Sequence, residues 1–168
     1  DVRIEPRRLE RALAAVAQRH QSLRFAYRAL AGYRGLRQLE RSGESIAVKL
    51  ADATSAGPAL AELLAAARKA VPDIGAGQTI VATIIHTGVS SSVIALNVAA
   101  LAADLASLPL LWRDLGLAYD GKLDEEEVFQ YSQYVEWRRD LDDDPEAAQG
   151  RAYWDDYLKR HAGAVVPQ

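Results

Sequence analysis

The sequence has no cysteine and no methionine among its 168 residues. The lack of cysteine excludes disulfide bonds, thiolate nucleophiles and zinc sites built from cysteine. It also lacks any excess of basic residues, because 20 Lys+Arg stand against 23 Asp+Glu and the formal net charge is −3. Nucleic-acid-binding domains normally carry a basic stripe, so we expect no nucleic-acid partner.

Long apolar runs are absent as well. No stretch approaches the roughly eighteen uninterrupted apolar residues that a membrane helix needs, so we expect no membrane partner. The first residues, Asp1 to Pro6, have neither the charged nor the apolar region of a signal peptide, and the cytoplasm is the expected location. The missing initiator methionine indicates a fragment of a longer chain.

What is present is a clear alternation of hydrophobic periods. Apolar residues recur at helical spacing in five segments and alternate, or form β-branched runs, in five others. The expected helices are 6–20, 58–70, 104–119, 131–141 and 145–161, and the expected strands are 23–28, 36–39, 46–50, 79–86 and 91–98. The last two strands should pair as a hairpin, which leaves 99–103 as a loop. The order predicts an α+β fold, a sandwich of helices on a mixed β-sheet.

Three histidines are the first candidates for general acid–base chemistry. His20 ends the first helix, where a capping or packing role is expected. His86 ends a strand, a place where catalytic groups do occur, so it is the alternative base. His161 lies among Lys159 and Arg160 and is expected to face solvent.

Other chemical motifs do not emerge from the residues. There is no HExxH sequence and no glycine-containing calcium loop in the acidic runs 124–127 and 142–144. Gly75 and Gly77 match neither a P-loop nor a dinucleotide fingerprint. The residues alone therefore predict no metal, no cofactor bound by this chain and no self-contained active site, which favours an interaction or scaffold role.

Residues 19–25 read RHQSLRF, and residues 131–137 read YSQYVEW. They resemble the RHxxLR and YxDFAxW segments of nonribosomal peptide synthetase condensation domains. Between them, 100–108 and the helix after it occupy the place of HHxxxDGxS, and 151–158 looks like the closing helix. The resemblance implies that 1–168 is the N-terminal lobe of a chloramphenicol-acetyltransferase-like fold, without the family's first strand motif.

The resemblance also implies partners. In this family a C-terminal lobe completes the domain, and peptidyl carrier proteins bring substrates as thioesters on their own phosphopantetheine arms.

The chain departs from the family at the motif that carries the chemistry. The two histidine positions fall on Ala99 and Ala100, and the glycine position falls on Leu105. A methyl group accepts no proton, and general base catalysis contributes about 10²–10⁴-fold. Asp104 is retained, and the resemblance implies an ion pair with Arg24; the alternative is that Asp104 only caps the following helix.

Two functional hypotheses follow, with a plainer third. The favoured one is a condensation-like domain without catalytic residues that docks carrier proteins or recruits a tailoring enzyme in trans, as family members do for hydroxylases and cytochrome P450 oxygenases. The alternative is an active condensation or acyltransferase domain that forms an amide or ester bond with a relocated base such as His86. The third is a structural spacer between modules.

Overall fold

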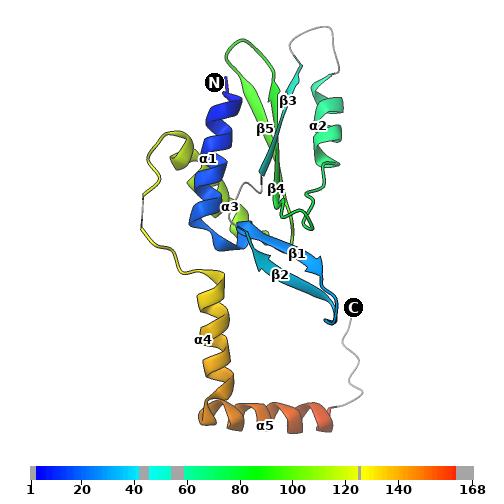
Figure 1. Cartoon of the computed structure of the whole chain (residues 1–168), viewed down its shortest axis with the longest axis vertical. Helices are drawn as coiled ribbons and strands as arrows, with labels where there is room; N and C mark the ends of the chain where they lie inside the picture. The colour runs from blue at the N-terminus through cyan, green and yellow to red at the C-terminus, as the bar shows by residue number, and fades with distance from the viewer. Residues whose placement is uncertain (1–2, 42–45, 54–58, 125, 162–168) are drawn as a thin grey trace. The chain divides into compact units, whose positions relative to one another are not determined.

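The computed structural model describes residues 3–41, 46–53, 59–124 and 126–161. The chain divides into two compact units, 1–128 and 129–168. The elements are α1 (Pro6–Arg19), η1 (Gln21–Arg24), β1 (Phe25–Ala29), β2 (Leu36–Glu40), β3 (Ile46–Asp52), α2 (Leu60–Arg68), β4 (Ile80–His86), β5 (Ser92–Val98), α3 (Ser107–Tyr119), α4 (Tyr131–Asp143) and α5 (Pro145–Arg160). All the predicted helices and strands are present in the predicted order (Figure 1).

The main sheet is mixed and has the order β3-β4-β5. β3 runs parallel to β4, whereas β4 and β5 are antiparallel, with Ile80 opposite Val98 and His86 opposite Ser92. The predicted hairpin is therefore confirmed. All seven residues of β4 are buried, as expected of a central strand covered on both faces.

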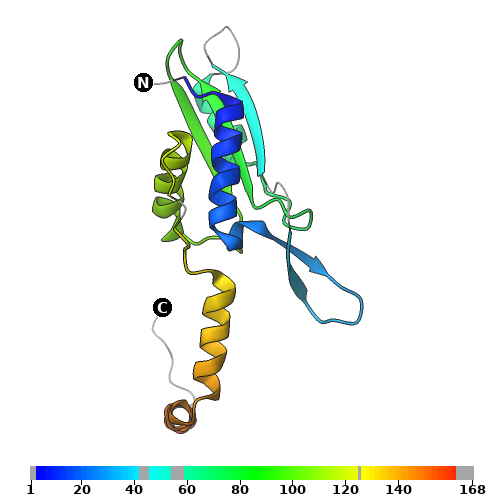
Figure 2. The ribbon, with the colours of Figure 1, turned by 60° about the vertical axis from the view of Figure 1, so that its left-hand side comes forward.

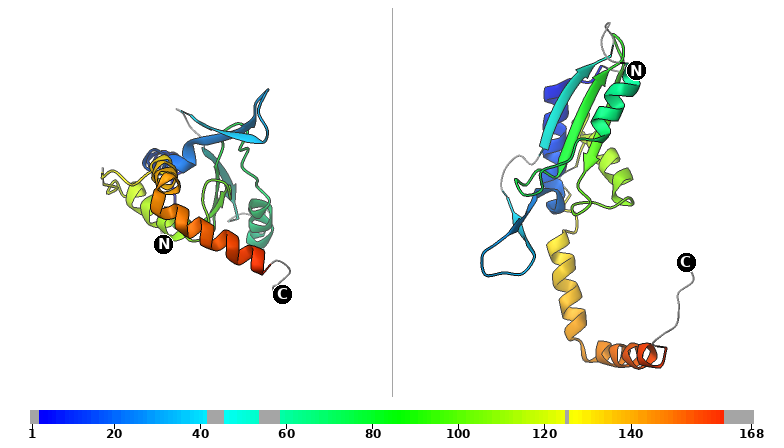
Figure 3. Two further views of the ribbon diagram at one scale, coloured as in Figure 1. Left: turned by 90° about the horizontal axis from the view of Figure 1, so that it is seen from below. Right: turned by 90° about the vertical axis from the view of Figure 1, so that its right-hand side faces the viewer.

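Helices cover both faces of this sheet. Alternate residues of β4, such as Ile80 and Ile84, join the core with Leu13 of α1 and Leu111 of α3. α2 packs on β4 and β5 from the other side (Figures 1 and 3). Pro6 begins α1 at a position where its missing N–H costs nothing. The α+β sandwich predicted from the periodicity is thus confirmed.

A separate two-stranded hairpin follows α1. β1 and β2 are antiparallel, with Phe25 opposite Glu40, and the hairpin extends away from α1 and the main sheet (Figure 2). The prediction that the strand begins at Leu23 is wrong, because residues 21–24 form the 3₁₀ turn η1. The amide of Leu23 donates to the carbonyl of His20, and this turn places the Leu23 side chain in the core.

The second unit consists of α4 and α5. Asp144 caps α5 by accepting a hydrogen bond from the amide of Glu146. Neither helix contains a buried residue, and large aromatic side chains such as Trp137 and Trp154 are about half exposed. In the described part of the chain, no helix has the length and apolar character to span a membrane.

Candidate functional site

The segment that the sequence resemblance assigns to the histidine motif lies between β5 and α3. The amide of Ala99 donates to the carbonyl of Thr79, and the amide of Ala102 donates back to Ala99 at 2.8 Å, so a tight turn follows the strand. The predicted loop over 99–103 is confirmed. Ala99 is buried, whereas Ala100 and Leu105 are exposed, and the Leu105 side chain is 85% accessible.

A hollow of about 440 Å³ lies beside this turn. Its walls come from the segment after α2 and from the end of β5. None of the described residues that line it has an ionisable side chain: Ala70, Val71, Pro72, Ile74, Asn97, Val98, Ala99, Ala100 and Leu101. The polar side chain among them, Asn97, is an amide whose nitrogen lies 3.4 Å from the carbonyl oxygen of Arg68. An amide has no useful basicity, so this hollow offers shape but no group that can exchange a proton.

The implied ion pair between Arg24 and Asp104 is wrong. The Asp104 carboxylate accepts hydrogen bonds from the amide and hydroxyl of Ser107, at 2.8 and 2.6 Å, where α3 begins. These hydrogen bonds lower the pKa of Asp104 below its ordinary value. The alternative capping role is the one observed.

Arg24 instead binds the C-terminal end of α1. Its guanidinium donates to the carbonyls of Ala17 and Gln18 and forms an ion pair with Glu40 at 2.7 Å. The last carbonyls of a helix attract a cation, which explains why the arginine turns toward α1 rather than toward α3. Arg24 thereby ties the hairpin to the helix.

His86, the alternative base, lies at the opposite end of the β4–β5 hairpin from Ala100. His86 closes β4 opposite Ser92, while Ala100 follows Val98, which lies opposite Ile80 at the other end of the same hairpin. Six residues of strand separate the two ends by about 20 Å. His86 is 4% exposed, and its Nδ1 lies 2.9 Å from the hydroxyl of Ser92. In the fold, His86 therefore makes a buried hydrogen bond with Ser92.

His20 has a buried partner that the sequence did not predict. Its Nε2 lies 2.7 Å from the carboxylate of Asp114, whose side chain is only 1% exposed. Arg113 binds the other carboxylate oxygen through two nitrogens, and Arg19 lies 3.4 Å away. His20 also caps α1 through its amide, so the capping and packing role is confirmed. Asp114 lies on the apolar face of α3 together with Leu111 and Leu115. A carboxylate on an apolar helix face needs a polar partner, and this was the feature of the sequence that could have predicted the contact.

The electrostatics of Asp114 follow from this geometry. Burial opposes its ionisation, but the hydrogen bonds from His20 and Arg113 and their positive charges prevail, so the pKa of Asp114 lies below its ordinary value. The carboxylate is saturated by side chains of its own fold. It therefore holds α1 against α3 rather than standing ready for a substrate.

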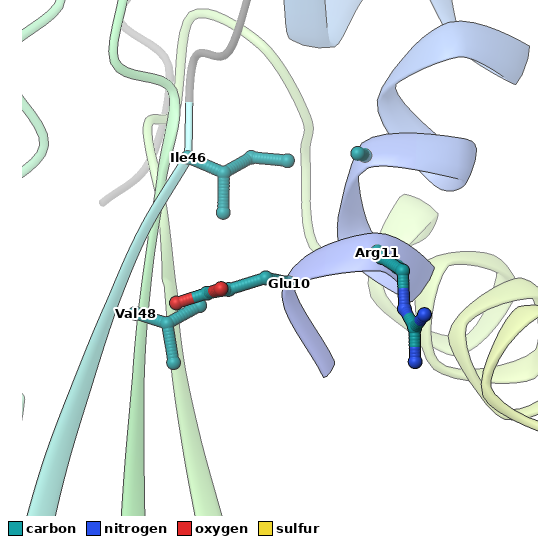
Figure 4. A pocket seen from close by; sticks show the side chains of 5 residues that line it. Glu10, Arg11, Ile46 and Val48 are labelled. Atoms are coloured by element: carbon teal, nitrogen blue, oxygen red, sulfur yellow. The ribbon is translucent and has the colours of Figure 1, made fainter. Parts of the chain in front are cut away.

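The remaining hollows of the first unit offer less. One of about 280 Å³ lies between α1 and β3, where the Glu10 side chain extends toward Val48 while Arg11 points away from the strand (Figure 4). The strand side of this hollow is aliphatic, formed by Ile46 and Val48. Among the described residues no three His, Asp or Glu side chains are placed to hold a metal ion. His161, at the end of α5, is exposed as expected.

The comparisons with known proteins agree with the resemblance seen in the sequence. The family model described as the condensation domain matches residues 1–167. The fold is similar to the starter condensation domain of rhizomide synthetase RzmA, with a TM-score of 0.79 at 20% identity. It is also similar to the epimerization domain from the third module of tyrocidine synthetase B, with 0.78 at 15%, and to the SgcC5 protein from Streptomyces globisporus, with 0.69 at 19%.

These likenesses cover nearly all of this chain but less than half of each relative. The alignments span 99%, 98% and 99% of this chain and 41%, 38% and 39% of the three solved chains, in the same order. No curated protein matches the sequence. The chain thus corresponds to one lobe-sized part of a condensation-domain fold.

Proposed function

This chain belongs to the condensation domain family, and we propose that it is the N-terminal lobe of a member that binds partners without forming bonds. In this role the domain docks peptidyl carrier proteins or recruits a tailoring enzyme that acts in trans. A C-terminal lobe of the same domain completes the fold, and the phosphopantetheine arm belongs to the carrier protein.

The observation that carries the proposal is the chemistry of the turn after β5. Ala99 and Ala100 occupy the histidine positions, and the 440 Å³ hollow beside them is lined without an ionisable side chain. Asp104 is exposed and bound to Ser107 at the start of α3. A condensation step needs the attacking amine to lose a proton, and none of these groups is suited to accept it.

Retention of the scaffold supports binding rather than decay. His20, Arg113 and Arg19 still surround the buried carboxylate of Asp114. Removing one member of such a buried set is strongly destabilising, so the set persists only where a folded domain is still needed. A structural spacer would also need a stable fold, but it would not need to bind a partner. Binding measurements therefore separate the spacer role from the docking role.

The relocated-base alternative loses its main candidate. His86 lies about 20 Å along the hairpin from Ala100, and its ring is buried against Ser92. A base supplied by another residue or by the other lobe would appear as turnover by the unmodified protein.

The test uses the full-length protein that contains this chain, with holo carrier proteins charged with a radiolabelled aminoacyl donor and an acceptor. We expect binding of carrier proteins, measured by fluorescence anisotropy, without peptide formation above background in a single turnover. The matched controls are an active condensation domain and its variant with alanines at both motif histidines. Turnover comparable to the active control would overturn the proposal, and so would the absence of binding to carrier proteins and tailoring enzymes alike.

A further inference from the structure

The β1–β2 hairpin, taken with Arg24 and Arg41 on either side of it, is basic in a chain that is acidic overall. Residues 24–41 carry five arginines and one glutamate, a net charge of +4, whereas the whole chain has −3. The single glutamate, Glu40, is already paired with Arg24. Four arginines of this hairpin therefore have no carboxylate partner within it: Arg28, Arg34, Arg37 and Arg41.

Two of these arginines face each other across the hairpin. Arg28 lies directly opposite Arg37, so their side chains leave the same face of the two strands. Like charges in this position destabilise a strand pair. Arg37 stacks over the ring of Tyr33 at 4.2 Å, and Arg28 donates to the carbonyl of Gly75. Neither contact neutralises the charge, so an anion between them would relieve the repulsion.

The two strands differ in how their edges are covered. β1 is bordered by the loop after α2, since the amide of Tyr27 donates to the carbonyl of Ile74 at 2.9 Å. β2 has β1 as its only neighbouring strand among the described residues, and all five of its residues are exposed. Two-stranded ribbons are marginally stable alone, and an open edge can accept a further strand.

We propose that the free edge of β2 is a docking site for an extended acidic segment of a partner protein, which adds to the hairpin as a third strand. Its carboxylates would lie on the face of Arg28 and Arg37, and its apolar side chains would pack beside Leu36, which is 58% exposed on the opposite face. This inference rests on the docking role proposed above and names one surface and the chemistry of its partner.

The same charges exclude other occupants. A second copy that paired through β2 would bring more arginines to the face that already holds Arg28 and Arg37, and such repulsion is a known means of preventing edge-to-edge association. Nucleic acid is disfavoured because the chain as a whole is acidic. An extended acidic protein segment can pair with the positive charges of Arg28 and Arg37 and can also hydrogen-bond to the free edge of β2.

The test uses a fluorescein-labelled peptide of about eight residues that alternates Glu with Val, long enough to span β2. A peptide with Lys in place of each Glu is its control, and a DNA duplex and phosphatidylserine vesicles are further probes. We expect the acidic peptide alone to bind, and hydrogen exchange of the amides of Leu36–Glu40 to slow when it does. Failure of the acidic peptide to bind, or tighter binding of DNA or vesicles, would overturn the proposal.

A charge reversal locates the site. Arg37→Glu should weaken peptide binding at least about tenfold, because like charges then meet across the added strand. The same change replaces the repulsion with Arg28 by an attraction, so the hairpin should be at least as stable as before. Loss of binding therefore cannot be ascribed to unfolding. Arg139→Glu on α4 alters the net charge equally and should bind like the unmodified chain; equal binding by Arg37→Glu would overturn the site.

The outcome is separable from that of the docking role. If carrier proteins bind the full-length protein equally well with and without Arg37→Glu, and the peptide does too, the hairpin site is wrong and the docking role stands. If no carrier protein or tailoring enzyme binds while the peptide does so through Arg37, the docking role is wrong and the acidic-segment site stands.

Discussion

The polar cluster around Asp114 and the turn that precedes α3 contain opposite kinds of residue. Asp114 is 1% exposed and is contacted by His20, Arg19 and Arg113. The turn at 99–103 consists entirely of alanine and leucine. Buried charge is present where it joins two helices, whereas the turn that the proposed function aligns with the family's histidine motif has no polar side chain. Under the proposed function, the fold is kept without a group for proton transfer.

The largest expected effect is on the free energy of unfolding, from a change in the Asp114 cluster. Asp114→Ala leaves His20 and two arginines without their carboxylate and should lower the free energy of unfolding by about 3–5 kcal/mol. Urea denaturation followed by circular dichroism measures it. Asp104→Ala is the matched control, since it also removes an aspartate bound to α3 but one that is exposed, and its loss should be clearly smaller. Equal losses would contradict the distinction between the two aspartates.

Acid should weaken the same cluster. The pKa of Asp114 is lower in the fold than in an unfolded chain, where aspartate titrates near 3.9, so the unfolded state binds more protons in that range. The stabilisation is complete above this pH and is lost as the pH falls through the lower, folded value. Urea denaturation at several pH values should show this slope in the unmodified chain and less of it in Asp114→Asn. An unchanged slope would show that other carboxylates dominate.

A smaller effect is expected at His86. His86→Ala removes a buried ring and its hydrogen bond to Ser92, so the free energy of unfolding should fall by about 1–3 kcal/mol. Binding of carrier proteins by the full-length protein should be unchanged, because the ring lies inside the first unit. Condensation activity that appears in the unmodified protein and disappears in this variant would revive the relocated base.

The smallest effect is expected from restoring one histidine. Ala100 is exposed, so Ala100→His should leave the free energy of unfolding within about 0.5 kcal/mol. It should also fail to restore condensation, because Ala99 leaves the first histidine position empty and Leu105 replaces the family's glycine. The triple change Ala99→His, Ala100→His and Leu105→Gly is the stricter comparison. Turnover by the single variant would show that one base suffices.

The sequence predicted the fold better than it predicted the side-chain contacts. Periods of apolar residues are local, so the helices and the β4–β5 hairpin could be located from the chain alone. Leu23 was misassigned because its alternation with Phe25 and Tyr27 continues through a turn that tertiary packing bends into η1. The family resemblance implies a pair between Arg24 and Asp104, whereas in the structure Arg24 donates to the carbonyls at the end of α1.

The distance between the two ends of a hairpin was also not predicted from the sequence. His86 and Ala100 are close in sequence, but an antiparallel hairpin carries residues at its turn away from residues at its open end. The His20–Asp114 contact spans 94 positions of sequence, and only the burial of a charge on an apolar helix face hinted at it. The assignment of Ala99 and Ala100 to the histidine positions depends on residue identity rather than on packing, and it stays a prediction.

Single-turnover peptide formation by the unmodified full-length protein tests the central claim most directly. With holo carrier proteins that carry donor and acceptor, and with binding verified in the same samples, we expect product at the level of the alanine-substituted control domain. The physical reason is that the described side chains lining the hollow beside Ala99 and Ala100 include none that can take the proton. Product formed at the rate of an active condensation domain would contradict the account.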